Sequence, residues 1–473
     1  MYNIADRLER LPFGRPHYRL LMMGGLGFAF DAMDLAIVAF VLPVLTVLWS
    51  LDSVQVGILG SATYIGYFFG AFSAGTLGDL IGRRRVMMYA LAIYCLATVV
   101  SALSTDWHTF FATRVIAGFG TGAESAIVVP FLIEFVASRY RGRFAGALAG
   151  FFSFGFVGAA LLGNMIVPLD AGAWRYALLI TALPIVMLLW WRRDLPESAR
   201  WLETRGRHAE ADAIVRKLED EIEARHGRLP EVTAGASAPP KVGTGTFLGN
   251  LKALWSRPLR RVTAMAWIVW FAQTSCYYAF FTWIPSLLVK SGMTMTKSFG
   301  YSILIYLAQI PGYYSAAFLV DKIGRKAVIV SYMMLAGVSA FGLANASSNT
   351  EIAIAGALLS FFMNGTYSGL YVYTPELFPT ELRATGHGVA SAIGRIGAIA
   401  SPIVVGYVYP IYGFAGVFGI TTAVLFIGGL AVLVLGIATK GRVLEDITAA
   451  EVGHVGLSEA PVAPMVAQTS TRA

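Results

Sequence analysis

Apolar residues form long stretches along this chain, and short polar turns separate them. A helix needs about 20 mostly apolar residues to cross the hydrocarbon core of a bilayer, and by eye the chain offers twelve such stretches. The regular alternation expected of β-barrel strands is absent from the sequence. The pattern predicts an all-α membrane protein with spans at residues 20–48, 54–77, 86–105, 108–133, 142–167 and 173–191, and then at 262–290, 297–320, 327–346, 350–374, 384–409 and 412–437.

Composition narrows the function classes. Only 14% of the 473 residues are charged, and 56% are hydrophobic, whereas a soluble domain carries about 25% charged residues. This balance excludes a soluble enzyme, a nucleic-acid-binding protein and a disordered scaffold. The sequence has no HExxH pair, nucleophile elbow or P-loop, so we expect neither an enzyme nor a cofactor. Cys95 and Cys276 both lie in apolar stretches, which indicates neither a disulfide framework nor a metal site.

The order of polar and apolar segments divides the chain. We expect a six-helix bundle at residues 1–191, a cytoplasmic linker at 192–261 and a second six-helix bundle at 262–437, followed by a disordered cytoplasmic tail at 438–473. Within the linker, residues 207–226 have the mixed charges of a soluble surface helix.

Basic residues predict the orientation. The net charge is +8, and cytoplasmic loops of membrane proteins carry an excess of Lys and Arg. With both termini inside, the connections on the cytoplasmic side hold Arg83, Arg84, Arg85, Arg139, Arg141, Arg143, Lys322, Arg325, Lys326 and Arg383, and those on the other side hold only Arg175, Lys290 and Lys297. We therefore expect a multi-pass protein of the cell inner (plasma) membrane with both termini in the cytoplasm and no removable signal peptide.

The two halves share a local motif. GDLIGRRR (Gly78–Arg85) follows the second span, and VDKIGRKA (Val320–Ala327) follows the eighth. Each places an Asp at a helix end, then an Ile-Gly turn and a basic cluster. A looser echo pairs Pro130, Glu134, Arg141 and Gly142 with Pro375, Glu376, Arg383 and Gly386. Repeated halves around a site near the bilayer midplane are typical of secondary transporters.

These motifs resemble the loop motifs of the major facilitator superfamily. RVIAGFGTGAESAIVVPFLIEFVASRYRGR and PESARWL resemble its sugar-porter and metabolite-symporter branch. Four further segments are most similar to the bacterial niacin (nicotinate) permeases. They are FAFDAMDLAIVAF, IVWFAQTSCYYAFFTWIP, LAQIPGYYSAA and YVYTPELFPTELRATGHGVASAIGRIGAIASPIVVG. The resemblance implies alternating access by two six-helix bundles. It also implies a cytoplasmic latch of the outward-open state made by Gly78, Asp79, Gly82, Arg83, Glu134, Arg141, Asp321, Gly324, Arg325, Glu376 and Arg383, with Arg141 or Arg143 extending the network around Glu134.

Well inside the predicted spans lie Asp31, Asp34, Arg114, Glu124 and Arg395, where a charge costs at least a few kcal/mol without a partner. Asp31 and Asp34 are three residues apart and share a helix face. Together with Glu124 they are candidates for proton coupling, and structural acceptors near the cavity wall are the alternative. Arg114 is about 15 Å of helix rise from Glu124, too far to pair with it, so we expect a structural role or an acid elsewhere as its partner.

Arg395 lies close to the middle of the eleventh predicted span. Its planar guanidinium suits a carboxylate, and the alternative is a fixed pairing with an internal acid such as Asp31. Polar and aromatic residues of the neighbouring spans suit a flat heteroaromatic acid, although such a stripe is more often ordinary packing. The predicted substrate-binding residues are Arg395, Trp270, Gln273, Tyr277, Tyr278, Trp283, Gln309, Asn364, Tyr371 and Asp31.

The leading hypothesis is a secondary transporter that imports nicotinate or a similar small aromatic monocarboxylate, either coupled to protons or as a uniporter. The alternatives are a carrier of another organic acid such as a hydroxybenzoate or a sugar acid, a non-transporting receptor on a carrier fold, and an efflux pump. The expected partners are the organic acid, protons and the lipid bilayer, with no nucleic acid, and we expect a monomer.

Overall fold

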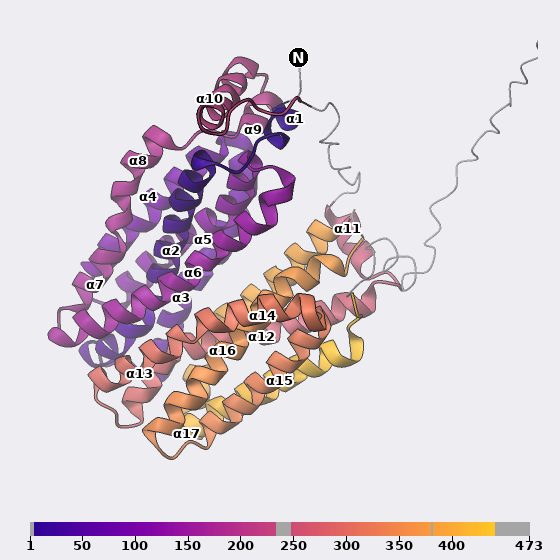
Figure 1. Ribbon diagram of the computed structural model, residues 1–473. Helices are drawn as coiled ribbons and strands as arrows, with labels where there is room; N and C mark the ends of the chain where they lie inside the picture. The colour runs from indigo at the N-terminus through magenta and orange to yellow at the C-terminus, as the bar shows by residue number, and fades with distance from the viewer. Residues whose placement is uncertain (1–3, 233–246, 380–381, 440–473) are drawn as a thin grey trace, which may run out of the picture.

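The computed structural model describes residues 4–232, 247–379 and 382–439. Within these ranges every regular element is helical, and the helices form two bundles that lie side by side (Figure 1). The predicted all-α class is confirmed. Most of the predicted disordered tail lies outside the described residues.

The first bundle is built from long helices whose bounds fall within a few residues of the predicted spans. A short helix, α1 (Ile4–Glu9), precedes it. The bundle consists of α2 (Arg15–Leu48), α3 (Ser53–Ile81), α4 (Arg83–Ala102), α5 (Trp107–Leu132) with the 3-10 turn η1 (Ile133–Phe135), α6 (Ser138–Ile166) with η2 (Val167–Leu169), and a sixth span made of α7 (Trp174–Thr181), η3 (Leu183–Val186) and α8 (Met187–Asp194).

The second bundle consists of α12 (Arg260–Lys290), α13 (Met295–Leu307), α14 (Gln309–Ile323), α15 (Arg325–Ala344), α16 (Asn349–Glu376) and α17 (Arg383–Leu435). The predicted span at 297–320 is divided between α13 and α14 at Ala308. Pro311 follows this break, and a proline lacks the amide N–H and collides with the carbonyl four residues back. The last two predicted spans run together as α17, but Gly413 has a φ of +62° and separates them.

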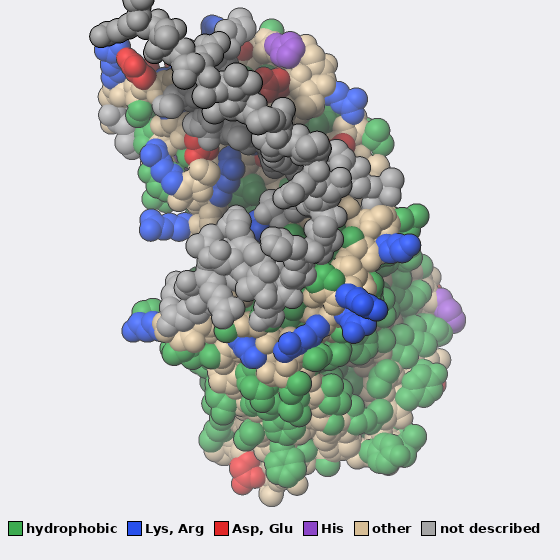
Figure 2. Space-filling view, turned by 90° about the vertical axis from the view of Figure 1, so that its right-hand side faces the viewer, with side chains coloured by type: hydrophobic (Ala, Val, Ile, Leu, Met, Phe, Trp, Pro, Cys, Tyr) green, Lys and Arg blue, Asp and Glu red, His purple; other side chains and the backbone are tan. Residues whose placement is uncertain are grey.

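Nine helical segments of the described chain are long and apolar enough to cross a membrane. One of them, α17, contains two spans. The two long helices outside this set are α12 and α16, which have 31 and 28 residues and carry more polar side chains. Counted together, these helices fit the twelve predicted spans. Figure 2 shows hydrophobic side chains covering the lower part of one face, with Lys and Arg gathered above them.

The repeated motif has the same backbone geometry in both halves. Gly82 joins α3 to α4 with φ +103° and ψ 146°, and Gly324 joins α14 to α15 with φ +96° and ψ 156°. Side chains with a Cβ rarely adopt this region. The Ile-Gly turn predicted from the sequence is therefore a glycine-dependent link between two helices, and it occurs once in each bundle.

Glycines also allow α3 and α5 to cross at very short range. A Cβ on Gly118 would lie 2.0 Å from the carbonyl oxygen of Thr63, and a Cβ on Gly66 would lie 1.8 Å from that of Val115. Only residues without a side chain permit this approach.

The two bundles meet at the end opposite α10 (His208–His226). There the Lys290 Nζ donates a hydrogen bond to the Ser53 Oγ at 2.8 Å, and a Cβ on Gly57 would lie 2.5 Å from the Pro402 carbonyl oxygen. At the other end, which carries α9 (Ala199–Thr204), α10 and α11 (Phe247–Leu254), the bundles diverge in Figure 1. The fold is thus closed at the predicted outer end and splayed at the predicted cytoplasmic end.

Ion pairs hold α1 against the surface helix α10, which the sequence predicted at 207–226. The Arg7 guanidinium contacts Asp212 at 2.5 Å and Glu219 at 2.5 Å, and Arg10 contacts Glu219 at 2.7 Å. Burial alone raises the pKa of Glu219, but the hydrogen bonds and charges of Arg7 and Arg10 outweigh it and leave that pKa below its usual value. We call these four side chains the N-terminal clasp.

Candidate functional site

Arg395 of α17 lies between the bundles with tyrosines as its neighbours. Its Nη1 donates a hydrogen bond to the Tyr278 hydroxyl at 3.0 Å, and its guanidinium carbon is 4.4 Å from the ring centroid of Tyr67. Within the described part of the chain, no carboxylate pairs with it, so the expected alternative of a fixed bond to Asp31 is not what the structure contains. A cation enclosed by aromatic faces retains its capacity to bind an anion.

The tyrosines around Arg395 come from both bundles. Tyr64 of α3 packs against Tyr278 of α12 with 4.6 Å between ring centroids, and its hydroxyl is 3.1 Å from the Thr282 Oγ1. The sequence did not predict Tyr64 or Tyr67 as site residues. A tyrosine in an apolar span carries no signal of its own, and only the packing of α3 against α17 brings these two to the site.

On the other side of Arg395, α16 contributes more rings. The ring of Tyr367 lies 5.1 Å from that of Tyr277 and 6.1 Å from that of Tyr371, centroid to centroid. The side chain of Tyr371 remains about half exposed. The predicted residues Tyr277, Tyr278 and Tyr371 therefore come together, with Tyr367 as an addition.

Two amide side chains near these rings have unused hydrogen-bonding atoms. The Gln273 Nε2 donates to the Met363 carbonyl at 2.7 Å, and the Tyr277 hydroxyl donates to the Gln309 Oε1 at 3.0 Å. The Gln273 Oε1 and the Gln309 Nε2 are buried and have no hydrogen-bond partner among the described residues. The site thus offers one acceptor and one donor to a ligand. Asn364 bonds to its own helix, through the Ser360 carbonyl.

The two predicted tryptophans have different surroundings. The Trp270 Nε1 donates to the Thr374 Oγ1 at 2.9 Å, and its ring lies 5.5 Å from that of Tyr371. Trp283 is fully buried and donates to the Pro402 carbonyl at 2.9 Å. Since Pro402 is seven residues, or about 10 Å of helix, beyond Arg395, Trp283 supports the closed outer end.

Asp34 and Arg114 form a fully buried ion pair between α2 and α5. The Arg114 Nη2 lies 2.5 Å from the Asp34 Oδ2, and both side chains have 0% exposure. The hydroxyls of Thr98 and Thr181 each donate to the Asp34 Oδ1 at 3.0 Å. Asp34 is thus the acid partner for Arg114 that the sequence placed elsewhere in the chain, and in this conformation its carboxylate is held by that ion pair.

Asp31 and Glu124 are also fully buried in the first bundle, and no Lys or Arg of the described residues pairs with either. Ser125 donates to the Asp31 Oδ2 at 3.1 Å, but the Asp31 Oδ1 and both Glu124 oxygens are buried and lack a hydrogen-bond partner among the described residues. An ionised carboxylate in such surroundings is costly. These two groups are therefore suited to binding a proton.

The predicted latch residues pair within each bundle in this conformation. Arg83 contacts Glu134, and its Nη2 is 3.6 Å from the Asp79 Oδ1. The carboxylate of Glu197 accepts the backbone N–H of Arg83 at 3.0 Å, and Ser198 donates to Glu134. The roles of Glu197 and Ser198, in the PESARWL motif, were not predicted.

The extension of this network by Arg141 or Arg143 was predicted for the outward-open state, and in this conformation Arg141 has other partners. Arg141 lies 3.8 Å from Glu9 and donates to the Val136 carbonyl, because Arg83 already occupies Glu134. In the second bundle the Arg325 Nε donates to the Glu376 Oε1 at 3.1 Å.

One further residue of the predicted latch, Arg383, bonds to the residue that precedes Glu376. The Arg383 Nε donates to the Pro375 carbonyl at 3.2 Å. The side chain of Asp321 lies outside the described part of the structure.

Two repeated helical bundles that enclose a polar and aromatic site define a multi-pass membrane transporter. A family described as "Sugar (and other) transporter" matches residues 28–450. The chain is 38% identical over 446 residues to the niacin transporter NiaP of Acinetobacter baylyi. The alignment covers 94% of this chain and 99% of NiaP. The chain belongs to the sugar (and other) transporter family, within the major facilitator superfamily.

Other relatives agree with this assignment. The inner membrane metabolite transport protein YdjE of Escherichia coli is 29% identical over 94% of this chain and 98% of its own length. Among solved structures, the xylose transporter XylE from E. coli in a partially occluded inward-open conformation aligns with a TM-score of 0.74 at 16% identity, over 90% of this chain and 99% of XylE. The fold predicted from the sequence is confirmed, and the protein is a secondary transporter.

Proposed function

We propose that this transporter imports nicotinate or a similar small aromatic monocarboxylate. The observation that supports the proposal is the position of Arg395, a guanidinium between the two bundles that is surrounded by tyrosines and paired with no carboxylate of the described chain. A guanidinium fork binds a carboxylate through two parallel hydrogen bonds. The likeness to the niacin transporter of Acinetobacter baylyi points in the same direction.

The neighbouring side chains suit the rest of such a ligand. With its carboxylate on Arg395, a flat ring would lie among Tyr67, Tyr278 and Tyr371, whose faces provide apolar contact. The Gln309 Oε1 accepts from the Tyr277 hydroxyl, and the Gln309 Nε2 has no hydrogen-bond partner among the described residues, which makes it a candidate donor for a ring nitrogen. A benzoate without a ring nitrogen would leave this donor unpaired.

Uptake of labelled nicotinate into cells that lack their own permease tests the substrate. We expect saturable uptake above a vector control, and its absence would contradict the proposal. Arg395→Ala should abolish uptake, Arg395→Lys should raise KM because the planar fork is lost, and the surface control Arg260→Ala should behave as wild type. All variants must reach the membrane in equal amounts.

Competition separates the candidate acids. Unlabelled nicotinate, a hydroxybenzoate, a sugar acid and nicotinamide are each added to the labelled uptake. Nicotinamide has the same ring without the carboxylate, so it should compete poorly. If it competes as well as nicotinate does, Arg395 does not recognise a carboxylate. Uptake by inverted vesicles would separate export from import.

We also propose that Asp31 and Glu124 carry the coupling proton. Both carboxyls are fully buried and pair with no cation in the part of the chain that the structure describes, whereas Asp34 is held by Arg114. Glu124→Gln and Asp31→Asn should lose accumulation driven by an imposed pH gradient and keep exchange of internal for external substrate. If both variants still accumulate substrate with the gradient, the coupling site lies elsewhere or the protein is a uniporter.

The proposed location is the inner membrane with both termini in the cytoplasm. The basic residues at the α10 end support this orientation. The structure then represents a state that is closed to the outside and open to the cytoplasm. Accessibility of a single cysteine introduced in α10 to a membrane-impermeant reagent, in intact and in lysed cells, tests the orientation.

A further inference from the structure

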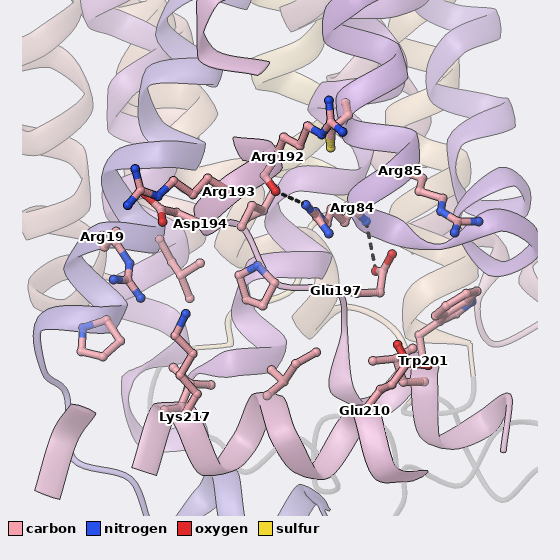
Figure 3. A pocket seen from close by; sticks show the side chains of 18 of the residues that line it. Arg19, Arg84, Arg85, Arg192, Arg193, Asp194, Glu197, Trp201, Glu210 and Lys217 are labelled. Atoms are coloured by element: carbon pink, nitrogen blue, oxygen red, sulfur yellow. Dashed lines mark hydrogen bonds between the residues drawn. The ribbon is translucent and has the colours of Figure 1, made fainter. Parts of the chain in front are cut away.

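A second site lies away from the proposed transport path, where α10 passes the ends of α2, α4 and α8 (Figure 3). It is a pocket of about 530 Å³. Seven of the side chains that line it are Lys or Arg, and four are Asp or Glu. Figure 3 shows Lys217 extending from α10 toward the side of the pocket where Arg19 and Arg193 lie.

Three of the four acids are already engaged. Glu221 accepts from Arg19 at 3.2 Å, Glu210 accepts from Arg207 at 2.6 Å, and Glu197 accepts the backbone N–H groups of the α4 start. Two of these acids pair with Arg19 and Arg207 of the same wall, and the seven basic and four acidic side chains leave a net charge of +3 in the lining. The pocket therefore presents an excess of positive charge.

Arg193 and Lys217 supply much of this excess. Both are exposed, and neither forms an ion pair with a carboxylate in the ranges that the structure describes. Elsewhere on the wall of this pocket the Nη2 of Arg84 donates to the Arg192 carbonyl, so the guanidinium of Arg84 has a fixed position. Fixed and free cations together suit an anion with several oxygens, such as a phosphate group.

The surroundings distinguish a lipid phosphate from a soluble one. Arg193 belongs to the last turn of α8, at the end of a membrane span, which is the depth of lipid headgroups. Val186 and Leu189 precede it at helical spacings of seven and four residues, so all three share one face. Their exposures of 62% and 72% leave an apolar strip that leads from the membrane to the pocket.

We propose that this pocket binds the headgroup phosphate of an anionic phospholipid from the leaflet on the α10 side. Lys217 and Arg193 contact the phosphate, and the acyl chains lie along Val186, the last residue of η3, and Leu189 of α8. A lipid bound there joins α10 to the first bundle, because Lys217 belongs to α10 and Arg193 belongs to α8 of the first bundle. This site is independent of the substrate that the transporter carries.

Native mass spectrometry of the full chain, purified from vesicles of phosphatidylcholine with and without phosphatidylglycerol, tests the proposal. We expect one phosphatidylglycerol molecule to remain bound at low detergent. Arg193→Gln/Lys217→Gln should reduce its affinity about 30-fold, since a juxtamembrane basic residue contributes on the order of 1 kcal/mol. Arg143→Gln/Arg260→Gln removes the same charge at other helix starts on this side and serves as the control.

Each other outcome overturns the proposal. An equal loss in the two double variants would show that general surface charge, and not the pocket, retains the lipid. Parallel samples with inorganic phosphate and with a nucleoside triphosphate, without anionic lipid, test a soluble ligand. If one of these binds in the pocket and phosphatidylglycerol does not, the ligand is a soluble phosphate compound. A wild-type protein that retains no anionic lipid also contradicts it.

Discussion

The Asp34–Arg114 pair connects α2 and α5 inside the first bundle, and its removal has a calculable cost. The carboxylate accepts hydrogen bonds from two guanidinium nitrogens, at 2.5 and 3.2 Å, and from Thr98 and Thr181. Both charged side chains are fully buried. Asp34→Asn leaves the Arg114 guanidinium buried without a counter-charge. Arg114→Gln likewise leaves the Asp34 carboxylate buried without a counter-charge.

Breaking a buried ion pair by removing one partner costs about 3–5 kcal/mol, because the remaining charge is uncompensated. We expect each single variant to lose this much free energy of unfolding. The double variant Asp34→Asn/Arg114→Gln contains no buried charge, so it should be more stable than the sum of the two losses implies. A coupling energy of at least about 2 kcal/mol is the expected result.

Reversible unfolding in mixed micelles, followed by tryptophan fluorescence, measures these free energies. The variant Thr98→Val removes one hydrogen bond from the same carboxylate and should cost only about 1 kcal/mol. If the two single losses add within about 0.5 kcal/mol in the double variant, the side chains do not interact as the structure indicates. Transport by the double variant then tests the role of Asp34 separately from stability.

Three further predictions follow from the packing and the surface contacts. Gly118→Ala should lose at least about 2 kcal/mol of unfolding free energy because its Cβ would meet the α3 backbone at 2.0 Å, whereas Gly146→Ala, with open space around it, should not. Gly57→Ala should keep the outer end from closing, since its Cβ would lie 2.5 Å from the α17 backbone, and should increase labelling of the site from outside. The N-terminal clasp should be intact above the usual Glu pKa of about 4.3 and open as the pH falls through the lowered pKa of Glu219. Hydrogen exchange of residues 4–9 measures this opening, and Arg7→Ala should reproduce it at pH 7; unchanged exchange in both cases would contradict the role of the clasp.

The membrane spans could be predicted closely because their signal is local. Residues 20–48 were predicted for a helix that covers Arg15–Leu48, and 54–77 for one that covers Ser53–Ile81. Hydropathy and length decide these bounds, and neither depends on the neighbours of a helix. The division of the span at 297–320 into α13 and α14 at Ala308 was not predicted, although Pro311 is a sequence signal for such a break.

The site could be predicted only in part. A single arginine within an apolar span identified Arg395 without any structure, since such a charge is costly there. Tyr64 and Tyr67 were missed because tyrosine is common in apolar helices, and their role depends on which face of α3 meets α17. Asp31 and Asp34 were treated as equivalent, but only Asp34 comes within reach of a cation that is 80 residues away in sequence.

The polar content of α12 and α16 has a consequence for how the protein is made. These two helices carry Gln273, Tyr277 and Tyr367, whose polar atoms bond to groups on other helices. As each helix leaves the ribosome alone, those partners are absent, and the translocon meets a segment that is less able than the others to enter lipid on hydropathy alone. We expect α12 to wait at the lateral exit until later helices such as α16 arrive, so that the residues that shape the cavity also set the order in which the second bundle is assembled.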